Sequence, residues 1–410
     1  MENKIVKLYE CCKSISDGDH LPPPKSQSGV PFITISNIDG DNQLNFNGTM
    51  FVTDSYYDSL SEEKKARIGD ILYSVVGSFG KPVFIDFDKR FVFQRHIAIL
   101  KPNDEVNSRY LYYVMLNSDF YFIADKLAIG AAQRTITLDS LRNMTVNIHD
   151  KATQNAIVDV LYCIDKKIKC NKKINDNLQQ QLKLLYDFWF PQFDFPDKNG
   201  KPYRSSGGAM VWNEQLKRQI PAGWEVKPLL EIVNWESNSQ PPKSEFIFEP
   251  KDGYIRFIQN RDYESDSHIT YIPYKDSLSI VDRLDILMDK YGDAGAVRYG
   301  IAGAFNVALG KINVLDKTNQ EYVRSYLESD GIYDYLHNSC MASTRASLNE
   351  SNLSMLRIII PERKVLSSFQ ETANSIRLSI LKQKDEIAML TSIRDWLLPM
   401  LMNGQATISD

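Results

Sequence analysis

Apolar residues recur four and three positions apart from about Thr153 to Phe190, with no Gly or Pro until Pro191. A sustained period of 3.5 residues is typical of a helix with a narrow apolar seam facing one partner helix. Two Asn residues occupy the middle of this seam. The seam positions are Ile157, Leu161, Ile164, Ile168, Asn171, Asn175, Leu178, Leu182, Leu185 and Trp189.

A second helix of the same kind closes the chain, and Pro399 is expected to end it. When Pro191 is set against Pro399, five seam positions match, and a polar residue occupies the middle one of each set. A polar seam residue fixes the register of a helix pair at a cost in stability, which favours a repeat over two unrelated core helices. The matches are Leu161 with Phe369, Ile168 with Ile376, Asn175 with Gln383, Leu182 with Leu390, and Trp189 with Leu397.

The segment before the first long helix alternates short β-like runs with turn residues, which predicts an α+β globule. We expect a short helix over residues 60–70 that ends at Gly69, followed by a strand leading into the loop GSFGKP. The other elements predicted are strands over 30–38, 70–76 and 90–100 and a helix over 108–127.

Residues 224–361 repeat the pattern of residues 1–150, so the chain is expected to contain two globular domains in tandem, each followed by a long helix. A tandem repeat of this kind favours two helices packed as an antiparallel coiled coil. The predicted boundaries are 1–150, a helix over 151–190, a Pro-, Gly- and Ser-rich connector over 191–223, 224–361, and a helix over 362–403. The repeat aligns Asn37 with Asn260, Asp70 with Asp285, Gly77 with Gly292, Gly80 with Gly295, Arg95 with Asn306, and Arg134 with Arg345.

Composition narrows the class of protein. The 410 residues carry a net charge of −4, which neither indicates nor excludes nucleic acid, because a DNA-binding protein needs only a basic face. No apolar run has transmembrane length, and the N-terminus does not resemble a signal peptide. Five Cys without a C-x-x-C motif fit a reducing cytoplasm and no zinc site, with Cys11 and Cys12 expected to be packing residues.

Catalytic signatures are few. GSFGKP differs from a phosphate-binding loop, since Pro82 follows the lysine where Ser or Thr should stand. No N-P-P-[FY] or D-P-P-[FY] motif is present, which argues against an adenine methyltransferase acting alone. Asp54 with Glu62 and Lys64 makes only a weak nuclease pattern, and the isolated His20 and His96 do not form a metal-binding pair. The sequence therefore predicts a non-catalytic chain without a metal site.

Polar residues occur at corresponding loops of the two globules, directly after predicted strands. Arg, Gln and Asn are the side chains that make bidentate contacts to guanine and adenine edges, although any one of them can equally be an ordinary loop residue or cap. In the first globule the candidates are Asp19, His20, Asn37, Ser78, Lys81, Gln94, Arg95, Gln133 and Arg134. In the second they are Gln240, Lys243, Gln259, Asn260, Arg261, Asp293, Asn306, Thr344 and Arg345.

Several segments resemble the specificity subunits of bacterial type I restriction–modification systems, and the resemblance covers nearly the whole chain. They are SDGDHLPP, GVPFITISNI, GDILYSVVGSFGKPVFI, QRTITLDSLRNM, the connector FDFPDKNGKPYRSSGGAMVWNEQLKRQIPAGWEVKPL, and LLPMLMNGQ. The resemblance implies two target recognition domains, each of which binds one half of a split double-stranded DNA sequence. It also implies that the helices are a spacer and a docking surface for two methyltransferase subunits, to which two restriction subunits add. S-adenosylmethionine would be held by the methyltransferase partners, which methylate adenine N6, and not by this chain.

Two differences between the repeats affect this expectation. The second globule begins with Pro221-Ala222-Gly223-Trp224, which the first lacks, and the first contains a Gly-Asp-His that the second lacks. The first helix is also longer, since Gln154 lies 37 residues before Pro191 whereas Gln370 lies 29 residues before Pro399. Two other interpretations stay open: a non-catalytic protein-binding scaffold with two modules, and an unrecognised nuclease or methyltransferase.

The matched seam spans 28 residues, or about 42 Å at the helical rise, against roughly 34–36 Å for one turn of DNA. We therefore expect a bipartite site with a fixed spacer and two different half-sites. Arg134→Ala is expected to cost about 1–3 kcal/mol in DNA binding if that side chain makes a bidentate base contact. The target sequence itself does not follow from the chain.

Overall fold

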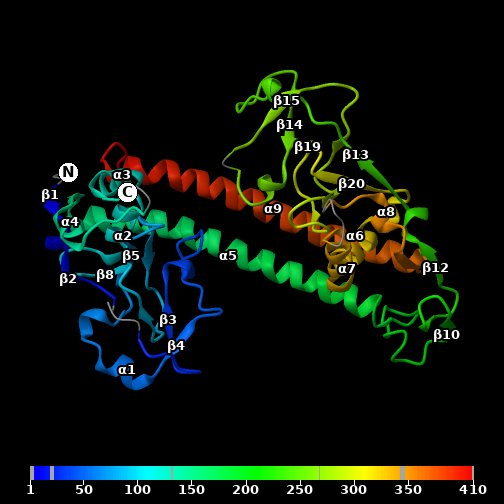
Figure 1. Ribbon diagram of the computed structural model, residues 1–410, viewed down its shortest axis with the longest axis horizontal. Coiled ribbons are helices and arrows are strands. Elements are labelled where there is room, and N and C mark those ends of the chain that lie inside the picture. The colour runs from blue at the N-terminus through cyan, green and yellow to red at the C-terminus, as the bar shows by residue number, and fades with distance from the viewer. Residues whose placement is uncertain (1–3, 19–22, 131–132, 267, 342–346, 409–410) are drawn as a thin grey trace. The chain divides into compact units, whose positions relative to one another are not determined.

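The computed structural model describes residues 4–18, 23–130, 133–266, 268–341 and 347–408, and the chain divides into two compact units. Unit 1 consists of residues 1–170 and 386–410, and unit 2 consists of residues 171–385. Two long helices, α5 (Lys151–Trp189) and α9 (Arg363–Met402), each contribute residues to both units (Figure 1). Each unit thus combines one globule with a part of each helix.

The contacts inside each unit give the direction of the helix pair. In unit 2, Trp189 near the end of α5 packs on Phe369 near the start of α9, with ring centroids 5.8 Å apart. In unit 1, Leu161 from the first half of α5 shares a buried cluster with Leu398 near the end of α9. The start of each helix therefore packs against the end of the other, and the predicted antiparallel coiled coil is confirmed.

Polar residues interrupt the apolar seam in unit 2. Counting two heptads from the Trp189–Phe369 contact places Asn175 opposite Gln383. Both side-chain oxygens are buried, and neither has a hydrogen-bond partner within the part of the chain that the structure describes. Burying such groups without a partner costs stability. This pair of residues therefore fixes the register of the two helices but does not stabilise their packing.

Helix α9 spans nearly the predicted range 362–403, but it does not end at Pro399, where the proline was expected to stop it. Proline lacks the N–H that would donate to the carbonyl of Asp395, so one helical hydrogen bond is lost. The helix nevertheless continues to Met402 because Leu398, Leu401 and Met402 are buried in the unit 1 core. Burial of each such side chain contributes about 1.5–3 kcal/mol, enough to offset the lost bond.

The globule of unit 1 is built on three antiparallel or mixed sheets. The sheet orders are β1-β9, β2-β8-β5-β6 and β4-β3-β7. The strands are β1 (Lys4–Lys7), β2 (Cys12–Asp17), β3 (Val30–Ile33), β4 (Met50–Val52), β5 (Ile71–Ser74), β6 (Pro82–Phe84), β7 (Val92–Phe93), β8 (Ile97–Pro102) and β9 (Thr145–Ile148). The helices are α1 (Asp54–Ser59), α2 (Ser108–Leu116), α3 (Ser118–Leu127) and α4 (Leu138–Asn143).

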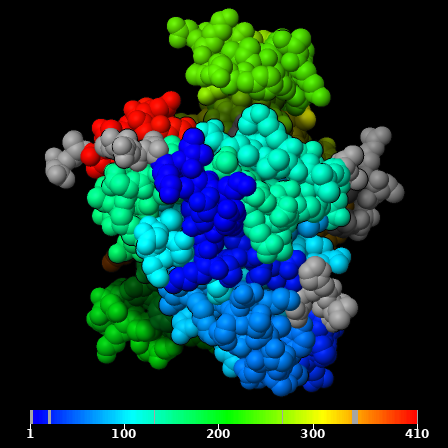
Figure 2. Space-filling model, turned by 90° about the vertical axis from the view of Figure 1, so that its left-hand side faces the viewer, coloured from blue at the N-terminus to red at the C-terminus, as the bar shows by residue number. Residues whose placement is uncertain are grey.

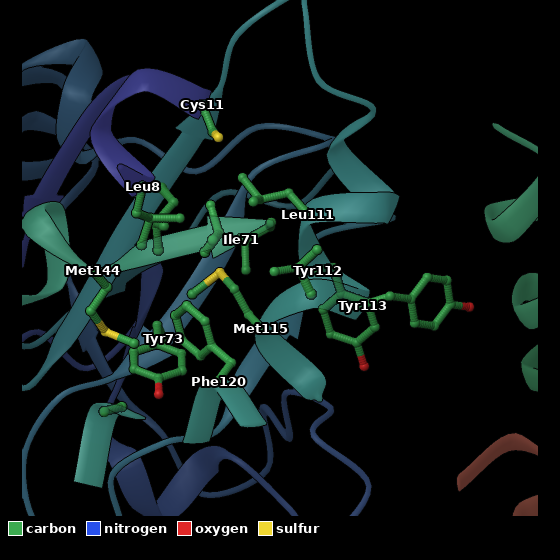
Figure 3. Packing of buried hydrophobic residues seen from close by; sticks show 14 of the residues in the cluster. Leu8, Cys11, Ile71, Tyr73, Leu111, Tyr112, Tyr113, Met115, Phe120 and Met144 are labelled. Carbon is green, nitrogen blue, oxygen red and sulfur yellow. The ribbon is translucent and has the colours of Figure 1, made fainter. Parts of the chain in front are cut away.

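The core of unit 1 lies between the central sheet and α2–α3. Figure 3 shows Ile71 and Tyr73 of β5 facing Met115 and Phe120 from these helices. The first residues described, drawn in dark blue in Figure 2, lie on the surface of this unit, where β1 pairs with β9 and Ile5 is 74% exposed. The thiol of Cys11 is buried in the core, as expected for a packing residue, and burial raises its pKa to about 11.

The sheet orders in the globule of unit 2 correspond to those of unit 1, except that β16 adds a fourth strand to the last sheet. They are β12-β21, β13-β20-β17-β18 and β15-β14-β19-β16, with the hairpin β10-β11 outside them. Its strands are β10 (Met210–Asn213), β11 (Arg218–Pro221), β12 (Glu225–Pro228), β13 (Val233–Ser237), β14 (Tyr254–Ile258), β15 (Tyr271–Pro273), β16 (Ile280–Val281), β17 (Ile286–Asp289), β18 (Val297–Arg298), β19 (Gly303–Phe305), β20 (Leu309–Val314) and β21 (Arg357–Ile360). Its helices are α6 (Gln320–Glu328), α7 (Asp330–Met341) and α8 (Glu350–Leu353).

Individual hydrogen bonds establish the repeat. Asp70 and Asp285 each accept from a backbone N–H three residues earlier, that of Arg67 at 2.8 Å and that of Asp282 at 3.0 Å. The backbone N–H groups of Gly80 and Gly295 donate to the carbonyls of Ser74 and Asp289, both at 2.9 Å. The tandem repeat of α+β globules predicted from the sequence is confirmed.

Two of the sequence alignments between the repeats were wrong by one or two residues. Asn37 caps the turn after β3 by accepting from the N–H of Thr34, and in unit 2 Asp262 does so for Gln259, so Asn37 corresponds to Asp262 and not to Asn260. The N–H of Gln94 donates to the carbonyl at the end of β3, as that of Asn306 does at the end of β14, so Asn306 corresponds to Gln94 and not to Arg95. Short polar segments have too little apolar periodicity to determine the alignment of the two repeats to a single residue.

Four predicted elements are shorter than expected. The strand over 30–38 ends at Ile33, where a 3-10 turn over Ile35–Asn37 begins. The strand over 90–100 is divided into β7 and β8, and the helix over 108–127 into α2 and α3. Asn117 separates the two helices because its side chain caps α3. Within 60–70 only Glu62–Lys64 is helical, as a 3-10 turn.

The connector folds onto the second globule through aromatic side chains. Phe195 stacks on both Tyr203 and Trp224, with ring centroids 4.6 and 4.9 Å away. The hairpin of β10 and β11 follows, and Trp224 leads into β12. Among the described residues, no helix has the length and apolar character needed to span a bilayer.

Candidate nucleic-acid interface

Five loops of unit 1 meet at the ends of the central strands. They follow β2, β3, β5 and β7, and the fifth precedes α4. Backbone hydrogen bonds join these loops to one another and to the strand ends, which gives them fixed relative positions. The bonds run from Gly18 N–H to Ile97 O (3.2 Å), Gln94 to Ile33 (3.0 Å), Val75 to His96 (2.9 Å), Ile136 to Val75 (3.0 Å) and Gly77 to Arg134 (3.0 Å).

Three of the predicted DNA-binding residues of unit 1 are exposed on these loops. They are Ser78, Arg95 and Gln133. The Arg95 guanidinium has no ion pair with any residue that the structure describes. Gln94 and Lys81 are half-buried, and the Lys81 ammonium lies 3.5 Å from the carbonyl oxygen of Asp39. These side chains present both donors and acceptors on one side of the globule.

Two other predicted residues of unit 1 already bind within the protein. The Arg134 guanidinium pairs with the Asp125 carboxylate at 2.7 Å and also donates to the Asp125 carbonyl oxygen. The Asn37 side chain accepts from Thr34 and donates to the carbonyl oxygen of Asn45 at 3.1 Å. Both residues therefore shape the loops in addition to any contact with a ligand.

The loop after β5 is held in place by a serine that the sequence did not single out. The Ser74 hydroxyl donates to the carbonyl oxygen of Ser78 and accepts from the N–H of Lys81, both at 2.9 Å. Gly80 has a φ of +90°, and a Cβ there would lie 2.5 Å from the Tyr121 ring, so only glycine fits. The loop residues Ser78 and Lys81 are thus presented on a fixed backbone.

The same loops meet in unit 2. Lys290 N–H donates to the carbonyl oxygen of Ala308 at 2.8 Å, and Leu348 N–H donates to that of Lys290 at 2.9 Å. Four of the predicted residues are exposed here: Gln240, Lys243, Arg261 and Asp293. Gln259 and Asn306 are half-buried, the first bonded to the Thr270 hydroxyl at 2.9 Å and the second to the N–H of Ala308 at 3.0 Å.

A buried carboxylate, absent from the sequence-based set, organises the loops of unit 2. Asp289 is 1% exposed and accepts from the Asn260 amide at 2.9 Å and from the Arg298 guanidinium at 2.7 and 3.0 Å. Arg298 also binds Asp293 at 3.2 Å, and Asp293 accepts from the Tyr333 hydroxyl at 2.5 Å. Burial raises the pKa of Asp289, while Arg298 and Asn260 oppose that shift.

The remaining predicted residues lie outside the described part of the chain. They are Asp19, His20, Thr344 and Arg345. Within the described ranges, no group of three or more His, Cys, Asp or Glu side chains is arranged to hold a metal ion. Each unit therefore has a loop face, formed by the loops at the ends of its central strands, and the two faces have similar backbones but different side chains. In unit 1 the exposed groups are a guanidinium, an amide and a hydroxyl, and in unit 2 two cations, an amide and a carboxylate.

Comparison with known proteins identifies the family. The model of the type I restriction modification DNA specificity domain matches residues 2–180 and 221–390. This chain belongs to that family. It is therefore the DNA-recognition component of a restriction–modification system, and the predicted absence of a catalytic role follows from that membership.

Two curated relatives are specificity subunits. The chain is 26% identical over 317 residues to the type I restriction enzyme MjaIX specificity subunit of Methanocaldococcus jannaschii, covering 75% of this chain and 71% of the relative. It is 26% identical over 410 residues to the HindI specificity subunit of Haemophilus influenzae, covering 84% and 88%. The crystal structure of the type I system S subunit from M. genitalium has the same fold, with a TM-score of 0.62 at 15% identity over 98% of this chain and 96% of that one.

Proposed function

We propose that this chain recognises a bipartite double-stranded DNA sequence, one half with each globule, and thereby directs adenine-N6 methylation and restriction by partner subunits. The observation that carries the proposal is the repeated loop face, built on equivalent strands in units 1 and 2 but bearing different exposed side chains. Equivalent backbones favour equivalent modes of docking, and different side chains favour different half-sites.

The helix pair supplies the spacing in this proposal. Helix α5 has 39 residues, which corresponds to about 58 Å, more than the roughly 34–36 Å of one DNA turn. A continuous helix with a register fixed by Asn175 and Gln383 is suited to hold two DNA-binding loop faces a constant distance apart. The spacer between the half-sites then has one preferred length.

The outer surface of the helices is suited to bind protein partners. In unit 1, Met389 and Trp396 of α9 are 66% and 62% exposed and lie seven residues apart, on one face of the helix. In unit 2, Leu184 and Phe188 of α5 are exposed and lie four residues apart. Exposed apolar side chains at helical spacing favour docking of further helices, which we assign to two methyltransferase subunits.

The chemistry itself belongs to those partners. Methylation of adenine N6 requires the base to leave the stack, and we propose that the methyltransferase subunits do this with S-adenosylmethionine bound to them. Two restriction subunits complete the assembly, which acts on cytoplasmic DNA. This chain contributes the choice of sequence and the geometry.

The test is to express this chain with its methyltransferase partner in a host without other adenine methylation and to sequence the methylated positions. The proposal predicts a motif of two specified parts separated by an unspecified spacer of constant length, methylated in both parts. A single continuous motif would contradict the bipartite arrangement. Absence of any sequence-specific methylation or binding, with the complex intact, would favour a protein-binding scaffold instead.

A further inference from the structure

Unit 2 contains a groove of about 540 Å³ on the side of the helices. Its walls come from the second half of α5, the turn after β14, β18 and the residue after it, α6, the start of α7, and α9. The residues used below are Tyr263, Tyr299, Ser325, Arg377 and Lys384. This volume lies within the range of small-ligand sites, about 300–1,000 Å³.

Three cations surround one aromatic ring at this groove. The Arg377 and Arg324 guanidinium carbons lie 4.7 and 4.8 Å from the centroid of the Tyr299 ring, and the Lys384 ammonium lies 5.4 Å from it. Arg324 is fully buried. A ring face attracts cations, but three like charges at one ring repel one another, so the arrangement requires negative charge nearby.

Carboxylates neutralise only two of these cations. Glu321 lies 3.1 Å from Arg324 and 3.2 Å from Arg377, and Glu328 also pairs with Arg377. No carboxylate of the described residues lies within 4 Å of the Lys384 ammonium. Desolvation first, and then the positive charges of Arg377 and Arg283, lower the pKa of Lys384. Lys384 is exposed, and Arg283 is paired with Asp385 at 2.7 Å, so Lys384 is the cation of this cluster that no carboxylate of the described residues neutralises.

The other charged groups of the groove are already paired or lie apart from this cluster. Lys183 pairs with Asp330 at 2.7 Å. Arg298 pairs with Asp289 at 2.7 Å. Asp187 is the remaining charged residue of the wall. None of these pairs supplies negative charge to Lys384.

Several buried donors beside the groove lack an acceptor. The Ser325 and Tyr263 hydroxyls, together with Nε and Nη1 of Arg324, are buried without a hydrogen-bond partner among the described residues. Such groups are nearly always satisfied in proteins, by protein atoms, water or ligand. The Arg324 nitrogens can only donate and the two hydroxyls can donate or accept, so an acceptor would satisfy all four groups, whereas Oε1 of Glu321, which also lacks a hydrogen-bond partner among the described residues, can only accept.

The corresponding ring in unit 1 has one guanidinium on it instead of three cations, which indicates that the cluster of three is not required by the fold. Tyr110 and Tyr322 both donate to a backbone carbonyl of the last strand, and this match aligns Tyr112 with Arg324. The strand pairing aligns Phe84 with Tyr299. In unit 1, the ring centroids of Phe84 and Tyr112 lie 5.8 Å apart, and the Arg109 guanidinium carbon lies 4.0 Å from the centroid of Phe84.

We propose that this groove of unit 2 binds a phosphate group, as inorganic phosphate or as part of a free nucleotide, through Lys384 and the Ser325 and Tyr263 hydroxyls. A tetrahedral oxyanion presents acceptors in several directions, which suits donors that come from three different elements. Its charge offsets the repulsion among Lys384, Arg377 and Arg324. The Tyr299 ring and the amides of Gln179 and Gln180 provide room and partners for a nucleoside.

The test uses equilibrium dialysis of the full chain with labelled inorganic phosphate and, separately, with labelled adenosine monophosphate at constant ionic strength. We expect saturable binding that Lys384→Met weakens at least about tenfold, the loss of one charge-assisted hydrogen bond. Lys382→Met, which removes another exposed lysine two residues away on α9 that does not line the groove, is the matched control and should bind as the wild type does. Ser325→Ala, a milder change, should weaken binding without affecting the folded state measured by circular dichroism.

Comparing the affinities for the two ligands distinguishes a site for a nucleotide from a site for inorganic phosphate. Tighter binding of adenosine monophosphate than of phosphate identifies a nucleotide site, and equal or weaker binding identifies a phosphate site. Equal affinities for wild type, Lys384→Met and Ser325→Ala would overturn the proposal. So would the absence of saturable binding of either ligand to a wild-type chain that still binds DNA.

Discussion

The Arg134 guanidinium donates to the carboxylate of Asp125, at 2.7 Å, and so joins the loop before α4 to the end of α3. The backbone carbonyl of Arg134 accepts from the N–H of Gly77 in the loop after β5 at 3.0 Å. One residue therefore links three segments of the unit 1 loop face. Its side chain belongs to the scaffold of that face as well as to the set of candidate DNA contacts.

Arg134→Ala should therefore lower the stability of folding. The pair is 42% exposed on both sides, so water screens it, and we expect a loss of about 1 kcal/mol in the free energy of unfolding. Urea unfolding of wild type, Arg134→Ala and Asp125→Ala measures this, and the double variant should lose less than the sum of the two single ones. Strictly additive losses would show that the two residues do not interact.

Arg95→Ala separates DNA contact from stability. Arg95 is exposed and pairs with no carboxylate among the residues described, so its removal should change the free energy of unfolding by less than about 0.5 kcal/mol. If it contacts a base, DNA binding should weaken by about 1–3 kcal/mol. On DNA in which the half-site assigned to unit 1 is mutated, the variant and the wild type should bind equally well. On DNA in which the other half-site is mutated, the variant should still bind more weakly than the wild type. A loss independent of both half-sites would indicate a phosphate contact instead.

Replacing Asn175 and Gln383 together by Leu tests the polar layer of the coiled coil. Their side-chain oxygens are buried without partners among the described residues, so two apolar side chains should raise the free energy of unfolding, by about 1 kcal/mol or more. The guanidinium chloride midpoint measures this change. A lower midpoint would mean that these amides stabilise the pair through contacts such as bound water.

Asp289 should give the stability of unit 2 an unusual pH dependence. Its folded-state pKa is raised by burial, whereas an Asp of the unfolded chain titrates near 3.9. The folded chain thus binds the proton more tightly, so this contribution to stability is greatest below about pH 3.9 and is lost as the pH rises through the folded-state pKa. Asp289→Asn removes that titration. Urea unfolding from pH 4 to 7 should show the stability of the variant rising relative to wild type, and a constant difference would contradict the assignment.

The long helices were predictable because a heptad pattern is local and repeats many times. Leu161, Asn175, Leu182 and Trp189 could be placed on one seam from spacing alone, and the structure buries all four. The effect of Pro399 on α9 was misjudged because the burial of Leu401 depends on the core of unit 1, which spacing does not reveal.

The candidate interface was less predictable for a related reason. The pairing of Asn260 with Asp289 joins residues 29 positions apart, and it depends on how η6 (Asn260–Tyr263) meets β17. Ser74 and Asp289 are the corresponding residues of the two repeats, and the loop begins directly after each of them. The sequence did not show this correspondence, because a hydroxyl and a carboxylate differ in chemistry. A signal was present: both directly precede the segment containing Gly77 and Gly292, whose φ values are +72° and +71°.

We propose that the helix pair sets the distance between two DNA-binding globules. Inserting one heptad into α5 and one into α9 beside Asn175 and Gln383 preserves the seam and lengthens each helix by about 10 Å. At roughly 3.4 Å per base pair, sequencing of adenine methylation should then find the same two half-sites with a spacer about three base pairs longer. An intact, active complex that methylates the original motif with its original spacer would contradict the claim.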